Sequence, residues 1–338
     1  MVFVTGGTGF LGAHLIYHLL SNGKHVRALK RETGNLLLFN RIFSFYQSSP
    51  EQLPGKLEWV NGDLLNVGQL DELISNDISE LYHTAAMVSF QPQDKSEMMR
   101  TNIAGTANLV NVSFNKNIRK LCHVSSIAAI GRGENQKTID ENTLWKASRR
   151  NSTYAVSKYG AEREVWRGME EGLPVVIINP SVILGPGETK SGTGKMISVV
   201  LKGLKFYSEG CNGFVDVRDV VKIMKQLTES GISGERFIVS AENLTYKEVF
   251  SMIAAETCKT PPAYKANRLM GQLAWRLSYL QGKLTGTKPL ITRETAITAG
   301  NTYLYSNRKI SEALNYRFLS VESAIKDACK FYLGNTEY

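Results

Sequence analysis

Tyr154 and Lys158 stand four residues apart in the segment TYAVSKYG, residues 153–160. Four residues are just over one helical turn, so on a helix both side chains point the same way. A phenol with an ammonium group beside it could donate or accept a proton. An ordinary amphipathic helix places the same two residue types at its polar edge, so this spacing alone does not establish an active site.

The expected effect of the lysine on the tyrosine can be given a size. A free tyrosine has a pKa near 10, too high to release its proton readily at neutral pH. An ammonium about 5 Å away, at an effective dielectric constant near 20, would favour the tyrosinate by about 3 kcal/mol, or roughly two pKa units. We therefore expect Lys158 to lower the pKa of Tyr154 and to make it a general acid or base.

The first thirty residues predict a nucleotide-binding turn. Apolar residues 2–4 read as a strand, Gly6, Gly9 and Gly12 follow, and leucines at helical spacing then predict a helix that Asn22-Gly23 closes. Glycines suit a sharp turn that must approach a pyrophosphate without a Cβ in the way, and a helix N-terminus offers free N–H groups to that anion. This strand–glycine–helix order predicts a dinucleotide site.

The end of the second predicted strand bears on the choice of cofactor. An NAD site usually has an acid there for the ribose hydroxyl, whereas basic residues accommodate the 2′-phosphate of NADP. This chain has Lys30 and Arg31 at that point, which favours NADP(H) over NAD(H). The alternative is that both cations are solvated and that Glu32 reaches the ribose.

Further strand-then-helix units follow along the chain, at KLEWVNGDLLN, SELYHTAAMVSF, KLCHVSSIAAIG and LPVVIINPSVILGPG. This alternation predicts an α/β fold, a Rossmann-type doubly wound parallel sheet with its ligands at the carboxyl ends of the strands. We expect residues 1–183 and about 212–240 to form the dinucleotide-binding domain. Residues about 184–211 and 241–338 should form a smaller, mostly helical substrate-binding lobe.

Composition limits the partners. Hydrophobic residues make up 43% and charged residues 21% of the 338 residues, as in a globular protein. The net charge of +9 is spread along the chain without a dense basic run interleaved with aromatics, so we expect no nucleic acid partner. The four cysteines lack metal-ligand spacing, which predicts no metal site and reduced thiols in a cytoplasmic protein. The chain has no 18-residue apolar run, so no transmembrane segment is expected.

Residues 268–284 are apolar at helical spacing, with basic residues between. A membrane-surface helix would have this pattern, but a helix packed on its own lobe is the commoner case, so we do not expect peripheral membrane contact. The chain could be a monomer or a homodimer, because the helices around 95–115 and 153–170 carry apolar residues that suit either state.

From residue 1 to about 240 the chain resembles the extended short-chain dehydrogenase/reductases, the NAD(P)-dependent epimerase/dehydratase group. The matching motifs occur in order: TGGTGFLG, GDL, HTAA, TNIAGTANLV, VSS, YAVSK, NPSVILGPG and FVDVRDVV. The C-terminal YLYSNRKISEALNYRFLSVESAIKD is similar to the dihydroflavonol reductase and hydroxysteroid dehydrogenase-like branch. Each motif is unspecific alone, but their order identifies the family.

The resemblance implies a role for particular residues. Ser126, Tyr154, Lys158 and Asn102 would form the catalytic set, with Ser125 as the alternative serine and Asn102 supporting a water-linked proton path. The other implied positions all line the cofactor, from the glycine turn past the adenine to the nicotinamide: Gly6, Gly9, Phe10, Leu11, Gly12, Lys30, Arg31, Asp63, Leu64, Ala85, Ala86, Pro180 and Ile183.

These residues predict an oxidoreductase that transfers hydride between NADP(H) and a small-molecule carbonyl or secondary alcohol. The first alternative is a nucleotide-sugar epimerase or dehydratase with a tightly bound dinucleotide. However, the stretch YSEGCNGFVDVRD lacks the arginine that such relatives use, and apolar Ile127-Ala128 stands where a dehydratase would want acids. The second alternative is a sensor or scaffold that binds dinucleotide without turnover, but the intact serine, tyrosine and lysine set argues against it.

Overall fold

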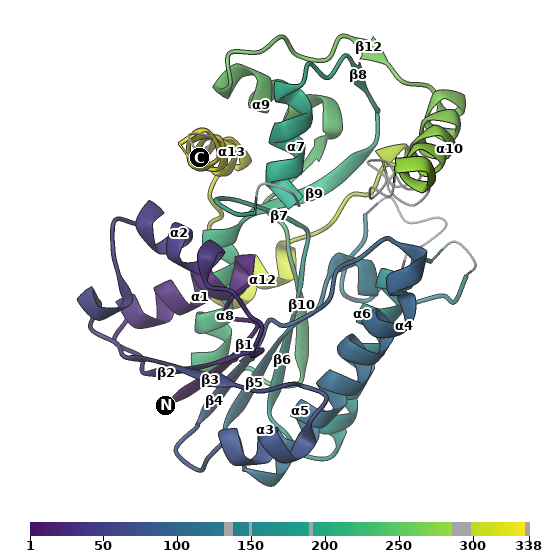
Figure 1. The fold of residues 1–338 in the computed structure, drawn as a ribbon. Helices are drawn as coiled ribbons and strands as arrows, with labels where there is room; N and C mark the ends of the chain where they lie inside the picture. The colour runs from purple at the N-terminus through teal and green to yellow at the C-terminus, as the bar shows by residue number, and fades with distance from the viewer. Residues whose placement is uncertain (132–137, 149–150, 189–191, 286–298, 335–338) are drawn as a thin grey trace.

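The computed structural model describes residues 1–131, 138–148, 151–188, 192–285 and 299–334. Its centre is a seven-stranded parallel sheet in the order β10-β6-β5-β4-β1-β2-β3 (Figure 1). This order has its topological switch point between β1 and β4, and it confirms the predicted Rossmann-type sheet. The strands are β1 (Val2–Thr5), β2 (Val26–Lys30), β3 (Leu57–Asn61), β4 (Glu80–His83), β5 (Lys120–Val124), β6 (Val175–Pro180) and β10 (Glu235–Val239).

Helices cover both faces of this sheet, because alternate strand residues point to opposite sides and both sets are apolar. Val2 and Val4 belong to one core, whereas Phe3 between them belongs to the other. The first core is completed by α1 (Phe10–Ser21), α2 (Leu37–Phe45) and α8 (Val217–Glu229). The second is completed by α3 (Val67–Leu73), α5 (Gly105–Asn115) and α6 (Thr153–Glu170). A short helix, α4 (Lys95–Met99), continues through a π-helical segment, Arg100–Ala104, into α5.

A second lobe lies beyond the carboxyl ends of the strands (Figure 1). Its core gathers apolar residues from a small sheet and three helices, Leu184, Phe214 and Val249 among them. The elements are the three-stranded sheet β7 (Val182–Leu184), β9 (Cys211–Asp216) and β11 (Glu242–Thr245), the pair β8 (Phe206–Tyr207) and β12 (Tyr264–Lys265), and the helices α7 (Gly192–Leu201), α9 (Tyr246–Glu256), α10 (Arg268–Thr285) and α13 (Val321–Leu333).

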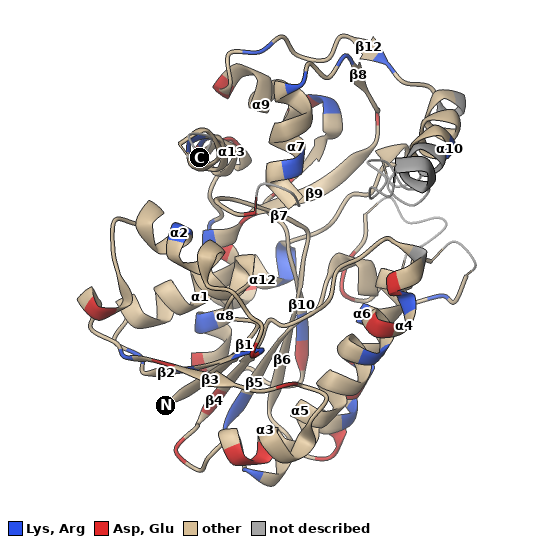
Figure 2. Ribbon diagram, viewed as in Figure 1, with Lys and Arg blue, Asp and Glu red and all other residues tan. Residues whose placement is uncertain are grey.

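The chain crosses between the two lobes more than once. After β9, which pairs in the small sheet, α8 and β10 return to the main sheet. Near the C-terminus, α12 (Arg308–Leu314) also returns, since its Ile310 is buried in the first core. The division of the chain into two domains stays a prediction. Lysines, arginines and acids are interspersed over both lobes (Figure 2), in keeping with the dispersed charge of the sequence. Among the described residues, no helix has the length and apolar character needed to cross a membrane.

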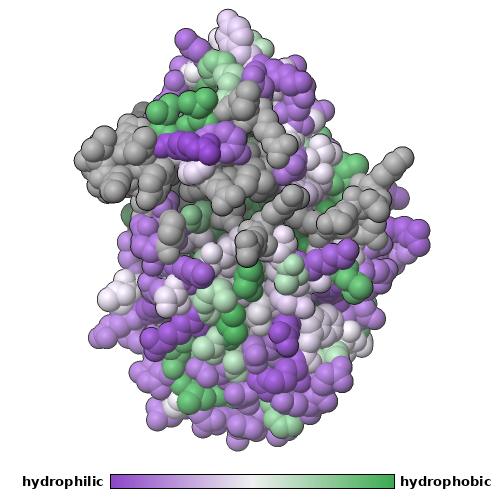
Figure 3. All heavy atoms as spheres, turned by 90° about the vertical axis from the view of Figure 1, so that its right-hand side faces the viewer, coloured by the Kyte–Doolittle hydropathy of each residue, from purple (hydrophilic) through white to green (hydrophobic). Residues whose placement is uncertain are grey.

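The helix α10 leaves apolar side chains exposed. Met270, Leu273 and Leu277 follow helical spacing and are 38%, 61% and 60% exposed, on a lobe whose surface mixes apolar and polar side chains (Figure 3). The sequence favoured a helix that packs this stripe on its own lobe. The other leucines of this stripe, Leu269, Leu280 and Leu284, lie outside the side chains that the structure describes, so the packing of the whole stripe stays a prediction.

We expect the double substitution Leu273→Gln and Leu277→Gln to lower the melting temperature by less than about 2 °C. Exposed substitutions of similar helix propensity usually change the free energy of unfolding by less than about 0.5 kcal/mol. Differential scanning calorimetry beside Leu19→Gln, a change at a fully buried residue of α1, gives the comparison. A large loss from the double substitution would mean that these leucines are covered in solution.

Candidate active site

The glycine turn between β1 and α1 is shaped by close backbone contacts. Gly6 has φ 75°, and a Cβ on it would lie 2.7 Å from the Ala85 nitrogen; a Cβ on Gly12 would lie 2.1 Å from the Gly6 oxygen. No side chain caps α1 at Gly9, and its first turn carries no acid. The N-terminus of α1 thus presents backbone N–H groups and a positive helix dipole, an arrangement that fits a dinucleotide pyrophosphate.

The predicted adenine and ribose residues lie at the ends of β2 and β3. Lys30 and Asn61 are register partners, and Lys30 Nζ donates to Asn61 Oδ1 at 2.6 Å. Arg31 is exposed one residue further on. Asp63 is also exposed, and its carboxylate accepts from the Leu65 nitrogen at 2.9 Å. The Leu64 side chain, in contrast, is buried in the second core, so only its backbone could face an adenine.

Arg27, the other cation of β2, is used elsewhere. Its Nε lies 2.8 Å from Glu58 Oε2, and its Nη1 donates to the Leu73 carbonyl at 3.1 Å and to Ser75 Oγ at 2.7 Å. Strand alternation turns Arg27 to the opposite face from its neighbours. Lys30 and Arg31 are therefore the cations that remain at this strand end.

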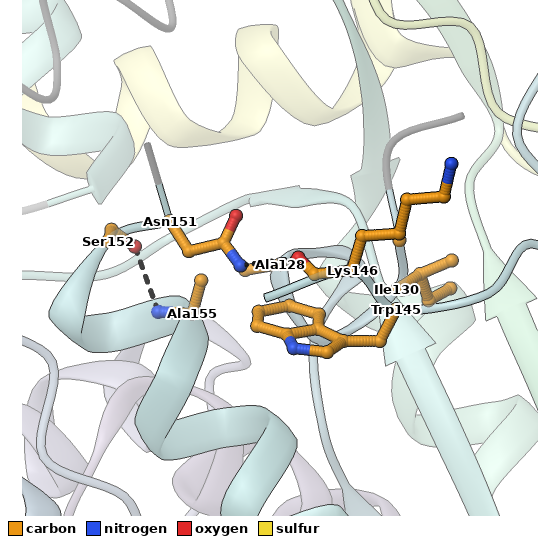
Figure 4. Close-up of a pocket in the computed structure, with 8 residues that line it drawn as sticks. Ala128, Ile130, Trp145, Lys146, Asn151, Ser152 and Ala155 are labelled. Atoms are coloured by element: carbon orange, nitrogen blue, oxygen red, sulfur yellow. Dashed lines mark hydrogen bonds between the residues drawn. The ribbon is translucent and has the colours of Figure 1, made fainter. Parts of the chain in front are cut away.

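Tyr154 lies in the first turn of α6, close to the end of β5. The Ser152 hydroxyl caps this helix by accepting from the Ala155 nitrogen at 2.8 Å (Figure 4). Ser126 follows β5, and its side chain interacts with the Tyr154 phenol and lowers the pKa of that group. The Ser126 oxygen also accepts from the Ala128 nitrogen at 3.1 Å, which caps a short 3-10 turn. The structure therefore brings Ser126 and Tyr154 together.

The electrostatics of Tyr154 differ from the sequence expectation. Burial raises the pKa of Tyr154 above its ordinary value, and the interaction with Ser126 opposes this only in part. The net shift in the protein alone is therefore opposite to the predicted lowering, because desolvation is the largest influence on this group. A raised pKa keeps the phenol protonated at neutral pH, as a proton donor requires.

Lys158 is buried one helical turn beyond Tyr154. Its Nζ donates to the carbonyl of Val124, the last residue of β5, at 2.8 Å. Burial lowers the pKa of Lys158 to about 8, and the negative charge of Glu162 opposes that shift. Lys158 therefore points at the strand end that precedes Ser125 and Ser126.

Ser125 and Ser126 have different partners, although the sequence could not separate them. Ser125 is buried, and its hydroxyl donates to Glu162 Oε2 at 2.6 Å. Ser126 is half-buried and is the serine that contacts the Tyr154 phenol. This geometry favours Ser126 as the serine that faces a substrate.

Asn102 lies in the π-helical segment and is buried. Its amide nitrogen donates to the Met87 carbonyl at 2.9 Å and to Ser157 Oγ at 3.0 Å, and its amide oxygen accepts from the Met87 nitrogen at 2.8 Å. Ser157 Oγ in turn donates to the Tyr154 carbonyl at 2.8 Å. Asn102 thus ties the loop after β4 to the turn of α6 that carries Tyr154.

The remaining predicted cofactor residues lie around the glycine turn and the end of β6. Ala85 follows β4 against Gly6, with Ala86 next to it, and Pro180 ends β6. Ile183 in β7 and Leu11 in α1 are half-buried against the first core. Phe10 packs against Gly187, where an added Cβ would lie 2.7 Å from Phe10 Cδ2. Sequence reasoning missed Glu162, although its place four residues after Lys158 was a usable signal.

A small cavity lies between the turn after β5 and the start of α6 (Figure 4). Its volume is about 20 Å³, which suffices for a water molecule but not for a substrate. It is lined by residues that follow β5 and by the segment before α6: Ala128, Ile130, Gly131, Trp145, Lys146, Asn151, Ser152 and Ala155. The Phe90 ring meets the Tyr154 ring edge-on, with centroids 5.8 Å apart.

Comparison with known proteins identifies a family and several relatives. The family model of the NAD dependent epimerase/dehydratase family matches residues 2–240. The putative dihydroflavonol 4-reductase of Synechocystis sp. is 29% identical and spans 98% of this chain and 94% of its own length. Sterol demethylase protein B of Methylococcus capsulatus is 31% identical over 74% of this chain and 72% of its own length.

Solved structures give the same fold. The crystal structure of gox2253 has a TM-score of 0.81 and 27% identity, and the match covers 99% of this chain and 98% of that one. MoeE5 in complex with UDP-glucose and NAD has a TM-score of 0.74 and covers 98% of both chains, but at 20% identity this likeness concerns the fold alone. The reductase relatives support the expectation of an NAD(P)-dependent oxidoreductase.

Proposed function

We propose, because the chain belongs to the NAD-dependent epimerase/dehydratase family, that it is a reductase that uses NADP(H) on a carbonyl compound or the matching secondary alcohol. The observation that carries the proposal is the contact of Ser126 with the Tyr154 phenol, one helical turn from buried Lys158. These three groups lie at the carboxyl ends of the strands, where ligands of this fold bind.

The dinucleotide would bind along the strand ends. The glycine turn and the N-terminus of α1 would hold its pyrophosphate, Lys30 and Arg31 its 2′-phosphate, and Lys158 its nicotinamide ribose. Asp63, Ala85, Ala86, Pro180 and Ile183 would line the rest of the groove. When bound, the nicotinamide supplies the hydride in reduction and accepts it in oxidation.

The side chains of the protein would supply the proton that the substrate oxygen needs during reduction. Tyr154, held protonated by its burial, would donate its phenolic proton to the substrate oxygen during reduction. Ser126 would hydrogen-bond the same oxygen and orient it. The Lys158 ammonium would stabilise the phenolate that remains, and the N-terminal end of α6 favours the same charge. Asn102 and Ser157 would hold Tyr154 in place through its carbonyl rather than take part in the transfer.

The surroundings of Tyr154 favour an apolar substrate. Phe90 meets the Tyr154 ring edge-on, and Ile127 and Ala128 stand next to Ser126. Aromatic and aliphatic neighbours suit a flat or hydrophobic carbonyl compound better than a sugar nucleotide. The dihydroflavonol reductase and sterol demethylase relatives support this substrate class.

We expect Arg31→Ala to weaken NADPH binding about tenfold and to leave NADH binding unchanged. A charge-assisted hydrogen bond to the 2′-phosphate contributes roughly 1.5–3 kcal/mol, and NADH has no such phosphate. Fluorescence titration with both dinucleotides measures this, with Arg163→Ala, at an exposed position of α6, as the control. Equal losses for both dinucleotides would mean that Arg31 does not read the phosphate.

The experiment that tests the proposal as a whole is a titration of the purified protein with NADPH and NADH. It is followed by the absorbance of the reduced nicotinamide against a panel of ketones, aldehydes and 4-keto sugars. Tight NADPH binding with turnover of an apolar ketone or aldehyde would support the proposal. Turnover of keto sugars alone would favour a sugar-nucleotide enzyme, and tight binding without any turnover would favour a sensor or scaffold.

A further inference from the structure

Glu162 is a buried carboxylate that the proton transfer above does not use. It lies on α6, one helical turn beyond Lys158 and two beyond Tyr154, and is 2% exposed. A buried carboxylate is costly unless hydrogen bonds and an opposite charge compensate it. The hydrogen-bond and ion-pair partners of Glu162 therefore indicate its role.

The partners of Glu162 come from three neighbouring strands or strand ends and from its own helix. Oε2 accepts from Ser125 Oγ at 2.6 Å and from Asn179 Nδ2 at 2.8 Å. Oε1 accepts from Arg236 Nη1 at 3.2 Å and from Trp166 Nε1 at 3.3 Å. Both carboxylate oxygens are thus paired, and Arg236 of β10 supplies the opposite charge.

Two of these bonds fix the turn that presents Ser126. The Ser125 hydroxyl donates to Glu162, and the Asn179 amide, which also donates to Glu162, donates to the Ser126 carbonyl at 3.0 Å. The turn after β5 is therefore held at two consecutive residues through one carboxylate. Loss of that carboxylate would leave the Ser125 hydroxyl and the Asn179 amide each without one acceptor, next to Ser126.

The charge of Glu162 also acts on Lys158. The titratable groups that interact with Lys158 are Glu162 on its own helix and His83 and His123 on β4 and β5, with Tyr154 one turn away on α6. Burial keeps both histidines uncharged at neutral pH. The Arg236 guanidinium pairs with Glu162 and partly offsets the negative charge that Lys158 experiences. Glu162 is thus the negative charge that opposes the burial of the Lys158 ammonium.

We infer that Glu162 is a positioning residue for the reaction, which holds the Ser125–Ser126 turn against Tyr154 and keeps Lys158 protonated for the dinucleotide ribose. The inference rests on the proposed function, since it needs Lys158 to bind the dinucleotide. It assigns no proton transfer to Glu162 itself. Removal of its charge should therefore act through Lys158 and appear as a change in the pH dependence of dinucleotide binding.

The test is the dissociation constant of NADPH, measured by fluorescence between pH 6 and pH 9.5. This range extends about 1.5 to 2 units on either side of the lowered pKa of Lys158, which is about 8. Binding by the wild-type protein should weaken as Lys158 loses its proton. In Glu162→Gln this midpoint should move down by about one pH unit, because the supporting negative charge is gone. In Arg236→Gln it should move up by a smaller amount, because the opposing positive charge is gone. Glu164→Gln, which removes a charge paired with Arg167 on the same helix, should leave the midpoint unchanged.

Opposite shifts in the two variants would support the inference, because a loosened fold would not move the midpoint in two directions. An unchanged midpoint in Glu162→Gln would overturn it, even if the melting temperature fell. Should Glu162→Gln fail to fold, an unchanged or lowered midpoint in Arg236→Gln would overturn it. If the wild-type protein bound neither NADPH nor NADH, the proposed function would fail, and this inference with it.

Discussion

Tyr154→Phe turns over its carbonyl substrate at least about a hundredfold more slowly than the wild-type protein and binds NADPH as tightly: this is the result that the site predicts. The substitution removes one oxygen and keeps the ring that Phe90 contacts. A positioned general acid contributes roughly 10²–10⁴ to a rate, and the hydroxyl of Ser126 cannot replace it because its proton is far less acidic. Stopped-flow measurement of a single turnover separates this loss from any change in product release.

The matched control for this prediction is Tyr159→Phe. Tyr159 lies on the same helix, and its ring stacks on Trp145 with centroids 4.4 Å apart, so the substitution again removes one hydroxyl and keeps the ring packing. Its turnover should stay within about twofold of wild type, as for a surface change that touches no reacting group. A Tyr154→Phe variant with a rate close to that of Tyr159→Phe would remove Tyr154 from the mechanism.

The parts of the fold that follow from local rules were predictable from the sequence. The glycine turn, the helix after it and the buried parallel strands depend on residue spacing within short segments, and all of them lie where the motifs indicated. The pairing of Lys30 with Asn61 at the ends of β2 and β3 was not predicted, because it depends on which strands are neighbours and on their register.

The features that the sequence did not predict depend on contacts between distant residues. The partners of Glu162 are Ser125, Asn179 and Arg236, up to 74 positions away, and nothing local indicates that they meet. The raised pKa of Tyr154 has the same origin, since the direction of the pKa shift depends on how deeply tertiary packing buries the phenol. The side chain of Leu64 turned inward because Gly105 of α5 leaves room for it.

The protein should lose stability steeply as the pH falls below about 6.5. Burial lowers the pKa of His14 to about 4 and of His83 to about 3, and lowers the pKa of His123 well below its usual range. The unfolded chain binds protons at these histidines below pH 6.5, whereas the folded protein does not, so the free energy of unfolding falls with pH through that window. At pH 5, a histidine that is protonated in the unfolded chain and neutral in the folded protein costs about 2 kcal/mol, a large share of a typical stability of 5–15 kcal/mol.

His123 is the residue with which to check this acid sensitivity. Its two ring nitrogens have no hydrogen-bond partner among the described residues, whereas His83 lies 2.7 Å from Thr5 Oγ1 and 2.9 Å from Thr106 Oγ1. His123→Leu therefore removes one titration without breaking a hydrogen bond. Urea unfolding should show the variant gaining about 2 kcal/mol more relative to wild type at pH 5 than at pH 8. Equal gains for His123→Leu at both pH values would mean that His123 is protonated alike in the folded and unfolded chains, and the acid sensitivity would then have another source.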